Sequence, residues 1–412
     1  MSETENNVIN ENEEISAKPV SRVELISEKL RRKKRRRRVN RVLRHGAIIL
    51  ALLAILVALG VGIYRHWDFF KPDTFREAVT LRDEGKSLMK IGGALDIITG
   101  NTAKYTAFAD GLAVVTTTNI RYATEDGEAG FITECQLTQP TTATEGDILV
   151  VYDRGGRSII VADQNGALAS GETIGKTIGV TVNADGGIVA VTEADGYQCA
   201  VTVYNKQLER QYTWKTPDYF ATIGLAASEE PVFAVAALEI REQELYSSIL
   251  LFNLQKEGVM AEVPLGRTAV VTMRECDNGF LVVTEDDVIC IDWDGTIRAR
   301  VSFSGDCVAG MAADGRDLYL LLVVDNDVTT RYRLIRIDGD GSIAAEISTK
   351  SEIKAISAGD GMLAVLTGHQ ICLYDTELDV RKYISPEPGV TNIILMHDNK
   401  LIMITPQEIF IA

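Results

Sequence analysis

The sequence predicts an all-β protein, a β-propeller of about eight blades that follows one N-terminal transmembrane helix. Three observations support this prediction. One phrase, an apolar strand followed by an acidic tight turn and a second apolar strand, recurs eight times after about residue 87. The repeats follow one another at intervals of 35 to 47 residues. A stretch of 19 uncharged residues precedes them.

The first 45 residues differ in charge from the rest of the chain. They carry 13 Lys and Arg side chains against 7 Glu, a net charge of +6, whereas the remaining residues carry 29 Lys and Arg against 51 Asp and Glu, a net charge of −22. Residues 1–19 are polar and rich in Asn and Glu, which predicts disorder. We interpret residues 1–45 as a basic cytoplasmic tail, partly disordered, in a different environment from the acidic remainder.

Residues 46–64 read GAIILALLAILVALGVGIY and contain no charged side chain. At about 1.5 Å per residue, a helix of this length spans roughly 28 Å, close to the hydrocarbon core of a bilayer. We therefore predict a transmembrane signal-anchor helix at 46–64. A buried core helix and a cleaved signal peptide are the alternatives, but the stretch lacks polar residues and no small-x-small cleavage site closes it.

A run of eight consecutive basic side chains precedes the predicted span: Arg31, Arg32, Lys33, Lys34, Arg35, Arg36, Arg37 and Arg38. Basic residues next to a span remain cytoplasmic, so we expect the N-terminus inside the cell and the C-terminal domain outside it. We also expect the run to contact anionic lipid head groups. Read alone it resembles a nucleic-acid-binding arm, but no aromatic or recognition-helix context accompanies it, so we predict no nucleic-acid partner.

Residues 65–86 are predicted to form a juxtamembrane linker or short helix. Thr74 and Glu77 have the spacing of a helix-capping box, and Gly85 can end the helix. The segment would separate the bilayer from the next domain, an extracytoplasmic propeller predicted at 87–412.

Eight acidic tight turns organise residues 87–412. Their acids are Asp110, Glu145, Asp185, Glu230, Asp277, Asp314, Asp360 and Asp398. Asp-Gly sequences favour tight hairpins, because glycine readily adopts the positive φ that these turns require. Each turn leads into a continuous apolar strand, such as LYLLLVV at 318–324, which suits a sheet covered on both faces. A third strand and a fourth, more polar strand usually follow.

Four strands in each repeat of about 41 residues are typical of a propeller blade. A single four-stranded sheet leaves its faces uncovered, whereas neighbouring blades in a ring cover them. The count favours eight blades, with a seven-bladed ring as the alternative. The last repeat ends at Ala412 after its third strand, so we expect residues 86–93 or 94–100 to add the outer strand and close the ring.

The phrases IDWDGTI (291–297) and IDGDGSI (337–343) resemble blades of the quinoprotein-like and outer-membrane-assembly-like propeller superfamily. The whole layout resembles an uncharacterised bacterial family of single-pass membrane proteins with a C-terminal propeller-like domain of unknown function. This resemblance implies an architecture and leaves the function open. The repeated tryptophan of quinone-dependent blades is missing from the chain, and so is the Trp-Asp repeat of WD40 blades.

The repeats contain few residues suited to catalysis. His369 and His397 lie in different repeats, and no nucleophile, zinc-protease or phosphate-loop motif accompanies them. We therefore predict a non-enzymatic protein with no cofactor and no metal site, since the Asp-Gly turns at 292–295 and 338–341 lack the later ligands of a calcium loop. The six cysteines lack zinc spacing, and we expect either free core thiols or one or two disulfides.

Carboxylates gather in the loops that join the second and third strands of four successive repeats. These loops share one face of a propeller. The candidate partner-binding residues are Glu193, Asp195, Glu239, Glu242, Glu244, Glu285, Asp286, Asp287, Asp325 and Asp327. Within these loops only Arg241 and Arg331 oppose them. Such a one-sided crescent can attract a basic partner; the alternative is a solvated rim on an acidic protein.

Together these features predict a membrane-anchored propeller outside the cytoplasm that binds a protein or ligand as a non-enzymatic scaffold in the bacterial cell envelope. The expected partners are the lipid bilayer and an unknown protein, for which a basic surface is the candidate. A ligand-sensing membrane receptor and an envelope lyase or hydrolase that uses the propeller funnel are the alternatives. A sensor would need a second protein, because the tail contains no signalling domain.

Overall fold

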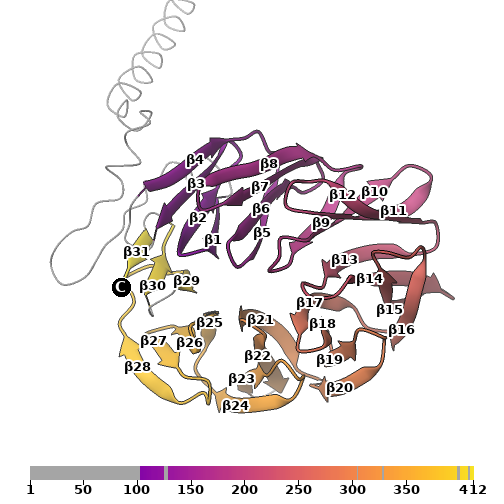
Figure 1. The fold of residues 1–412 in the computed structure, drawn as a ribbon. Helices are drawn as coiled ribbons and strands as arrows, with labels where there is room; N and C mark the ends of the chain where they lie inside the picture. The colour runs from indigo at the N-terminus through magenta and orange to yellow at the C-terminus, as the bar shows by residue number, and fades with distance from the viewer. Residues whose placement is uncertain (1–102, 125–128, 304, 327–328, 397–399, 407–408) are drawn as a thin grey trace, which may run out of the picture. The chain divides into compact units, whose positions relative to one another are not determined.

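The structure, a computed structural model, describes residues 103–412 except 125–128, 304, 327–328, 397–399 and 407–408. These residues form 31 strands in eight antiparallel sheets. The sheets stand around a central axis as the blades of a propeller (Figure 1). The prediction of an all-β, eight-bladed propeller is therefore confirmed, and the seven-bladed alternative is wrong.

Each blade is built from strands that are consecutive in the chain, with the first strand innermost (Figure 1). Blades one and two comprise β1 (Lys104–Phe108), β2 (Gly111–Val115), β3 (Asn119–Thr124), β4 (Ala129–Glu134), β5 (Pro140–Glu145), β6 (Ile148–Asp153), β7 (Ser158–Asp163) and β8 (Gly166–Glu172). Blades three and four comprise β9 (Thr177–Val182), β10 (Ile188–Ala194), β11 (Tyr197–Tyr204), β12 (Arg210–Thr216), β13 (Phe220–Ala226), β14 (Val232–Arg241), β15 (Glu244–Asn253) and β16 (Val259–Gly266). Blades five and six comprise β17 (Val270–Cys276), β18 (Gly279–Thr284), β19 (Asp287–Asp292), β20 (Ile297–Ser302), β21 (Cys307–Asp314), β22 (Asp317–Asn326), β23 (Thr329–Ile337) and β24 (Ile343–Thr349). Blades seven and eight comprise β25 (Ile353–Gly359), β26 (Met362–Thr367), β27 (Ile371–Tyr374), β28 (Val380–Ile384), β29 (Asn392–Leu395), β30 (Leu401–Ile404) and β31 (Ile409–Ile411).

The predicted acidic turns join the first and second strands of the blades. In blade six, Gly315 adopts the positive φ (56°) expected of such a turn. In blade one the positive φ (50°) falls on Ala109 instead. Gly111 there begins β2, and a Cβ atom added to it would lie 2.2 Å from the main-chain oxygen of Ala123 in β3. Glycine is therefore needed at this position for the close approach of β2 and β3, not for the turn. The turn at Asp398 lies outside the described residues.

The core is divided among eight apolar clusters, one between each pair of neighbouring blades. Strand β14 shows why the second strands are continuously apolar. Val232, Ala234 and Ala236 pack against blade five. The alternate residues Phe233 and Val235 pack against blade three. Successive side chains of a strand point to opposite faces, so a sheet covered on both faces buries every one of them.

Blade eight contains three strands among the described residues. It still packs on blade one, because Ile394, Ile402 and Ile411 join one cluster with Leu112 and Val114. Strand β29 also contacts β1. This apolar interface closes the ring. The predicted closing strand at 86–93 or 94–100 lies outside the described residues and stays a prediction.

Three predicted segments precede the described part of the chain: the basic tail (1–45), the transmembrane helix (46–64) and the juxtamembrane linker (65–86). They stay predictions. Within residues 103–412, the gaps given above aside, no helix has the length and hydropathy needed to cross a bilayer.

Candidate functional site

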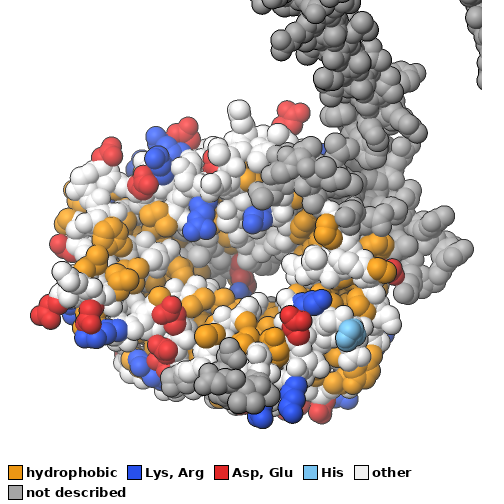
Figure 2. Space-filling view, turned by 180° about the vertical axis from the view of Figure 1, so that it is seen from behind, with side chains coloured by type: hydrophobic (Ala, Val, Ile, Leu, Met, Phe, Trp, Pro, Cys, Tyr) orange, Lys and Arg blue, Asp and Glu red, His pale blue; other side chains and the backbone are white. Residues whose placement is uncertain are grey.

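The ring has two distinct faces. The turns between first and second strands gather around one mouth of the central channel, and we call this side the turn face. The connections between second and third strands lie on the opposite side, the hairpin face, because strands of a blade alternate in direction. Figure 2 views the ring from the side opposite to Figure 1 and shows acidic and basic side chains scattered around a central opening.

The structure brings predicted acids from three blades to the hairpin face: Glu193 and Asp195 beside the β10–β11 connection, Glu239, Glu242 and Glu244 in the β14–β15 hairpin, and Glu285, Asp286 and Asp287 at the β18–β19 turn. Blade six contributes Asp325 near the end of β22. The side chain of Asp325, and all of Asp327, lie outside what the structure describes.

Four of these acids form ion pairs: Glu193 with Lys176 (3.9 Å), Glu239 with Arg241 (2.6 Å), Glu244 with Arg267 (2.5 Å) and Asp287 with Arg300 (3.4 Å). The hydrogen bond from Arg241 lowers the pKa of Glu239. The prediction that only Arg241 and Arg331 oppose the crescent is therefore wrong. Lys176, Arg267 and Arg300 come from connections and outer strands outside the acidic loops, so the loop sequences do not reveal them.

Three acids of the hairpin face keep free carboxylates. Asp195, Glu242 and Asp286 are exposed, and their carboxylates form no hydrogen bond or ion pair with any other residue in the described part of the chain. Glu285 accepts a hydrogen bond from the main-chain nitrogen of Ala269 (3.4 Å). The negative potential of the face is thus concentrated at a few points rather than spread along a crescent.

Exposed apolar side chains lie on the same face, a feature that the sequence reasoning missed. Ile178, Phe220 and Val271 sit at the starts of the innermost strands β9, β13 and β17, and are 37%, 42% and 40% exposed. Ile240 and Leu245 at the end of the β14–β15 hairpin are 61% and 58% exposed. Apolar surface that borders charged surface is typical of protein-binding sites.

The β14–β15 hairpin projects from the ring. Strand β13 pairs with β14 only as far as Phe220 with Leu238, whereas β14 and β15 stay paired up to Arg241 with Glu244. Three residues of β14 therefore extend beyond the inner strand, a length of about 10 Å at the usual rise of a strand. This projection carries both Ile240 and Leu245 away from the blade core.

The turn of the hairpin is strained, and contacts between charged and aromatic side chains lie at its base. Glu242 and Gln243 adopt φ of 52° and 70°, a conformation that costs side-chain-bearing residues about 1–3 kcal/mol each. At its base the ring of Tyr246 lies 5.6 Å from the guanidinium carbons of both Arg241 and Arg267. Such cation–π contacts contribute about 0.5–1 kcal/mol each at exposed sites and, with the ion pairs above, favour this orientation of the hairpin.

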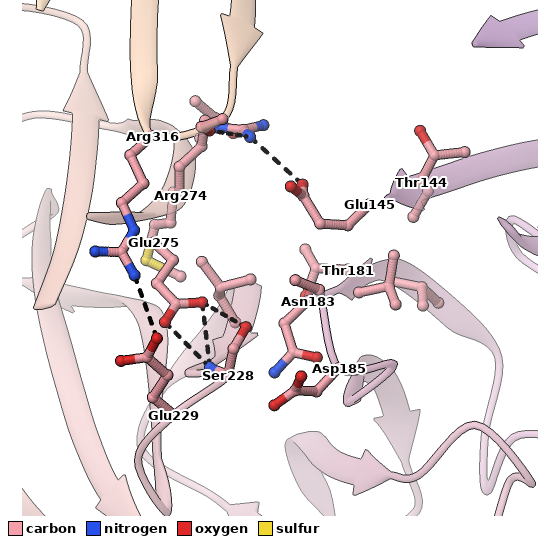
Figure 3. A pocket seen from close by; sticks show the side chains of 18 residues that line it. Thr144, Glu145, Thr181, Asn183, Asp185, Ser228, Glu229, Arg274, Glu275 and Arg316 are labelled. Carbon is pink, nitrogen blue, oxygen red and sulfur yellow. Dashed lines mark hydrogen bonds and ion pairs between the residues drawn. The ribbon is translucent and has the colours of Figure 1, made fainter. Parts of the chain in front are cut away.

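On the turn face, two cavities of about 460 and 320 Å³ open at the mouth of the channel. The larger is lined by the ends of β5, β9, β13 and β17 (Figure 3). Small and hydroxyl-bearing side chains, including Ala143, Thr144 and Thr181, line it. These short side chains leave room for a ligand or for a segment of another protein.

An ion pair crosses the channel between the two cavities. The Arg274 guanidinium, at the end of β17, donates from Nη2 to Glu145 Oε2 at the end of β5 (3.4 Å; Figure 3). It also donates to the main-chain oxygen of Gly315 (3.3 Å). Glu145 and Arg274 belong to blades two and five, 129 residues apart. All three residues line both cavities, so the pair divides the mouth of the channel.

Two further carboxylates of the larger cavity, Glu275 and Glu229, have partners, whereas that of Asp185 forms no hydrogen bond or ion pair with another residue in the described part of the chain. Glu275 accepts hydrogen bonds from the main-chain nitrogen (3.1 Å) and hydroxyl (2.7 Å) of Ser228. Arg316 pairs with Glu229 (3.6 Å) and with Asp277 (3.2 Å). Among the described residues, no group of three or more His, Cys, Asp and Glu side chains is arranged to hold a metal ion. The cavity can receive a cationic group by exchange of ion-pair partners.

Residues 86–411 match the sequence model described as Family of unknown function (DUF5711). The chain belongs to DUF5711. The predicted membership of an uncharacterised family with a propeller domain is thereby confirmed, whereas the bacterial single-pass membrane arrangement stays a prediction. No curated protein matches this DUF5711 chain.

Solved structures similar to this DUF5711 propeller share its fold at low sequence identity. A eukaryotic initiation factor aligns with a TM-score of 0.50 at 11% identity, over 74% of this chain and 82% of that chain. BamB from Moraxella catarrhalis aligns with a TM-score of 0.48 at 10% identity, over 76% and 94%. AztD from Citrobacter koseri aligns with a TM-score of 0.46 at 12% identity, over 71% and 88%. At these identities the similarity concerns the fold alone.

The sequence reasoning missed two features of the DUF5711 site. The sequence pattern identifies Glu145 only as the acid of a turn and does not single out Arg274, because their contact joins blades that are distant in the chain. For the apolar patch one signal was available: ALEIREQELY, at 237–246, is longer than the corresponding loops of other blades and contains apolar residues at a connection that is elsewhere polar.

Proposed function

We propose that this DUF5711 protein is a membrane-anchored, extracytoplasmic scaffold that binds a basic, amphipathic segment of a partner protein on its hairpin face and catalyses no reaction. The observation that supports this proposal best is the combination, on one face, of exposed apolar side chains with unpaired carboxylates.

The chemistry of the hairpin face specifies the partner. Ile240 and Leu245 offer apolar surface that a partner can remove from water, which is the main source of affinity at protein interfaces. Free carboxylates at Asp195, Glu242 and Asp286 favour Lys and Arg over acidic side chains and speed the approach of a basic partner. A segment that alternates basic and apolar residues satisfies both demands.

The contacts at the base of the hairpin support a binding role as well. Interfaces lose affinity when flexible segments must be ordered on association. The contacts of Tyr246 with Arg241 and Arg267 hold the hairpin before a partner arrives, so less ordering is required. A charged residue at a turn position that favours glycine is also expected where the side chain, rather than the turn, is needed.

The cellular location in the proposal rests on the N-terminal segments. Ten Lys and Arg side chains lie between Arg31 and Arg44, immediately before the uncharged stretch at 46–64. By the positive-inside rule, this arrangement leaves the propeller outside the cytoplasm. The hairpin face would then meet partners in the cell envelope, and the basic cluster Arg31–Arg38 would rest on anionic lipids.

In-cell photocrosslinking of the full chain tests the proposal. A photoreactive amino acid replaces Gln243 or Asp286 on the hairpin face, and Asp147 or Glu257 on the turn face as exposed controls. We expect a discrete adduct from the hairpin-face sites. Mass spectrometry of the adduct should identify a partner segment in which Lys or Arg residues alternate with apolar residues.

A matched set of charge variants tests whether the adduct depends on the unpaired carboxylates. Asp195→Asn, Glu242→Gln and Asp286→Asn together should reduce the adduct yield several-fold, and more strongly at low ionic strength because exposed charges are screened by salt. Equivalent neutralisation of Asp147 and Glu257 should leave the yield unchanged. Equal adducts from both faces, or an acidic crosslinked segment, would show that the proposed surface is wrong.

A ligand-sensing receptor is the second candidate, favoured by the paired cavities on the turn face. A cationic ligand that displaces Arg274 from Glu145 would join the two cavities and report its presence through β5 and β17. Deletion of residues 1–30 should abolish signalling by a sensor and leave a scaffold functional. The third candidate, an envelope lyase or hydrolase, has less support, because three of the four carboxylates that line the larger cavity, Glu145, Glu229 and Glu275, are engaged by partners.

A further inference from the structure

Two of the six cysteines meet inside blade five. The Sγ atoms of Cys276 and Cys290 lie 3.2 Å apart, and the two residues are 0% and 1% exposed. Both thiols are free, as are the other four. Their sequence spacing resembles no known redox motif, so this contact is a product of the fold.

The backbone brings the two sulphur atoms together across an intervening strand. Cys276 ends β17 and Cys290 lies in the middle of β19, with β18 between them. Gly279 begins β18, and a Cβ atom there would lie 1.9 Å from the main-chain oxygen of Ile291. The absence of a side chain at Gly279 lets the β17–β18 turn approach β19 and carries Cys276 to Cys290.

A guanidinium group lies beside the thiol pair. Arg298 Nη2, from β20, is 3.0 Å from Cys290 Sγ and 3.8 Å from Cys276 Sγ. Its Nε lies 3.2 Å from Asp292 Oδ1, and the carboxylate of Asp340, in the β23–β24 turn of blade six, also interacts with it electrostatically. These two acids hold the arginine in place and moderate its charge.

This environment separates the two thiols chemically. The hydrogen bond with Cys276 and the charge of Arg298 lower the pKa of Cys290 against the opposing effect of burial. The same hydrogen bond and burial raise the pKa of Cys276. One sulphur is therefore favoured as the thiolate nucleophile and the other as the proton donor. Redox-active dithiols divide their roles in this way.

We propose that Cys276 and Cys290 form a redox-active dithiol that a small hydroperoxide oxidises to a disulfide, with Arg298 as the positioning residue that stabilises the Cys290 thiolate. The Cys290 sulphur attacks the hydroperoxide, a sulphur–oxygen bond forms, the oxygen–oxygen bond breaks, and the departing alkoxide takes a proton and leaves as the alcohol. The Cys276 sulphur then attacks the sulfenic acid, the disulfide forms, and water leaves with the Cys276 proton. The two thiols lose two electrons, which reduce one hydroperoxide to alcohol and water.

Burial decides which oxidant can act. A bulky disulfide reagent cannot reach thiols that are covered by the turn containing Gly341. This turn packs so closely that a Cβ atom added at Gly341 would lie 2.7 Å from the Cβ of Cys290. A hydroperoxide such as hydrogen peroxide is small enough to pass beside the Arg298 side chain, which is 28% exposed. The product would link two strands that are not adjacent.

The test exposes the purified full chain to hydrogen peroxide, blocks remaining thiols by alkylation and measures each cysteine by peptide mass spectrometry. Cys199 is the matched control, since it is also 1% exposed but burial raises its pKa. We expect a Cys276–Cys290 linked peptide at peroxide doses that leave Cys199 reduced. A dithiol that stays reduced until Cys199 is oxidised would overturn the proposal.

Three variants separate the roles of the residues. Arg298→Gln should slow disulfide formation roughly tenfold and move its pH profile to higher pH, because less thiolate is present. Arg298→Lys should restore part of the rate. Cys276→Ser should leave a Cys290 sulfenic acid that dimedone traps, provided that circular dichroism shows an intact fold. An unchanged rate and pH profile in Arg298→Gln would refute the role of the arginine, and failure to trap the sulfenic acid in folded Cys276→Ser would refute the reaction order.

Discussion

Removal of two exposed apolar side chains, Ile240 and Leu245, from the hairpin face should weaken partner binding without unfolding the propeller. Ile240 is 61% exposed and Leu245 58%. Complete burial of such a side chain contributes roughly 1.5–3 kcal/mol, so about 1–2 kcal/mol remains available to a partner at each position. Truncation of both to alanine should therefore cost about 2–4 kcal/mol of binding free energy, a change of roughly 30- to 700-fold in Kd.

The assay uses the partner segment that crosslinks to Gln243, synthesised with a fluorophore. Its Kd is measured by fluorescence anisotropy against the full chain in nanodiscs of zwitterionic lipid, which do not attract basic peptides. The control pair, Val259→Ala with Met260→Ala, lies in the same blade at the opposite end of the sheet, where these side chains are 44% and 43% exposed.

Both double variants should keep the urea midpoint of the parent, because substitution of an exposed side chain changes the free energy of unfolding by no more than about 0.5 kcal/mol. A Kd that changes less than threefold in the hairpin variant would refute the reasoning. So would an equal loss in the control pair, because the affinity would then not depend on the hairpin face.

Three further predictions concern stability and local order. Gly279→Ala should lower the free energy of unfolding by more than about 2 kcal/mol in urea titration, because the added Cβ would clash with the main chain. Gly368→Ala, where nothing lies within 4 Å of the added Cβ, should cost less than about 0.5 kcal/mol. Similar losses in the two variants would contradict this prediction. Burial raises the pKa of Tyr319 to about 12, so its contribution to stability is complete below the unfolded pKa of about 10 and is lost as the pH rises to about 12. Tyr319→Phe should remove that alkaline loss without lowering stability at neutral pH, since its hydroxyl has no hydrogen-bond partner within the described residues; a loss above about 1 kcal/mol would show that the hydroxyl is satisfied. Replacement of Glu242-Gln243 by Asn-Gly should slow amide hydrogen exchange at the hairpin tip about fivefold by relieving positive-φ strain; faster exchange would show that the turn is not strained.

The repeat architecture could be predicted because it depends on patterns of residues that are neighbours in the chain. An apolar strand such as 318–324, with no polar alternation, requires apolar neighbours on both sides, and the structure supplies them from blades five and seven. The positions of the acidic turns followed from Asp and Gly chemistry, although Ala109 shows that the residue with positive φ need not be the glycine. The grouping of acids on one face then followed from topology. Successive connections between antiparallel strands lie on opposite faces of the ring, so all connections between second and third strands share one face.

The electrostatics of that face could not be predicted in the same way. Glu239 and Arg241 are two residues apart and their pairing was within reach, but Glu244 meets Arg267 through the arrangement of β15 and the chain beyond β16. The pairing reduces the free charge of the hairpin face to a few carboxylates. Apolar exposure was equally hidden, because Phe220 and Ile178 have the same sequence character as buried residues of other inner strands.

The sequence by itself determined the all-β class, the number of repeats, the position of their turns and the presence of an uncharged stretch behind a basic cluster. All of these are patterns of neighbouring residues, and strand and turn preferences are local. Only the tertiary structure decided that Glu145 meets Arg274 across the channel, that Arg298 lies against Cys276 and Cys290, and that Ile240 and Leu245 project beside free carboxylates. Those contacts depend on how blades curve around a ring and how strands twist within a blade, and no local pattern encodes these distances.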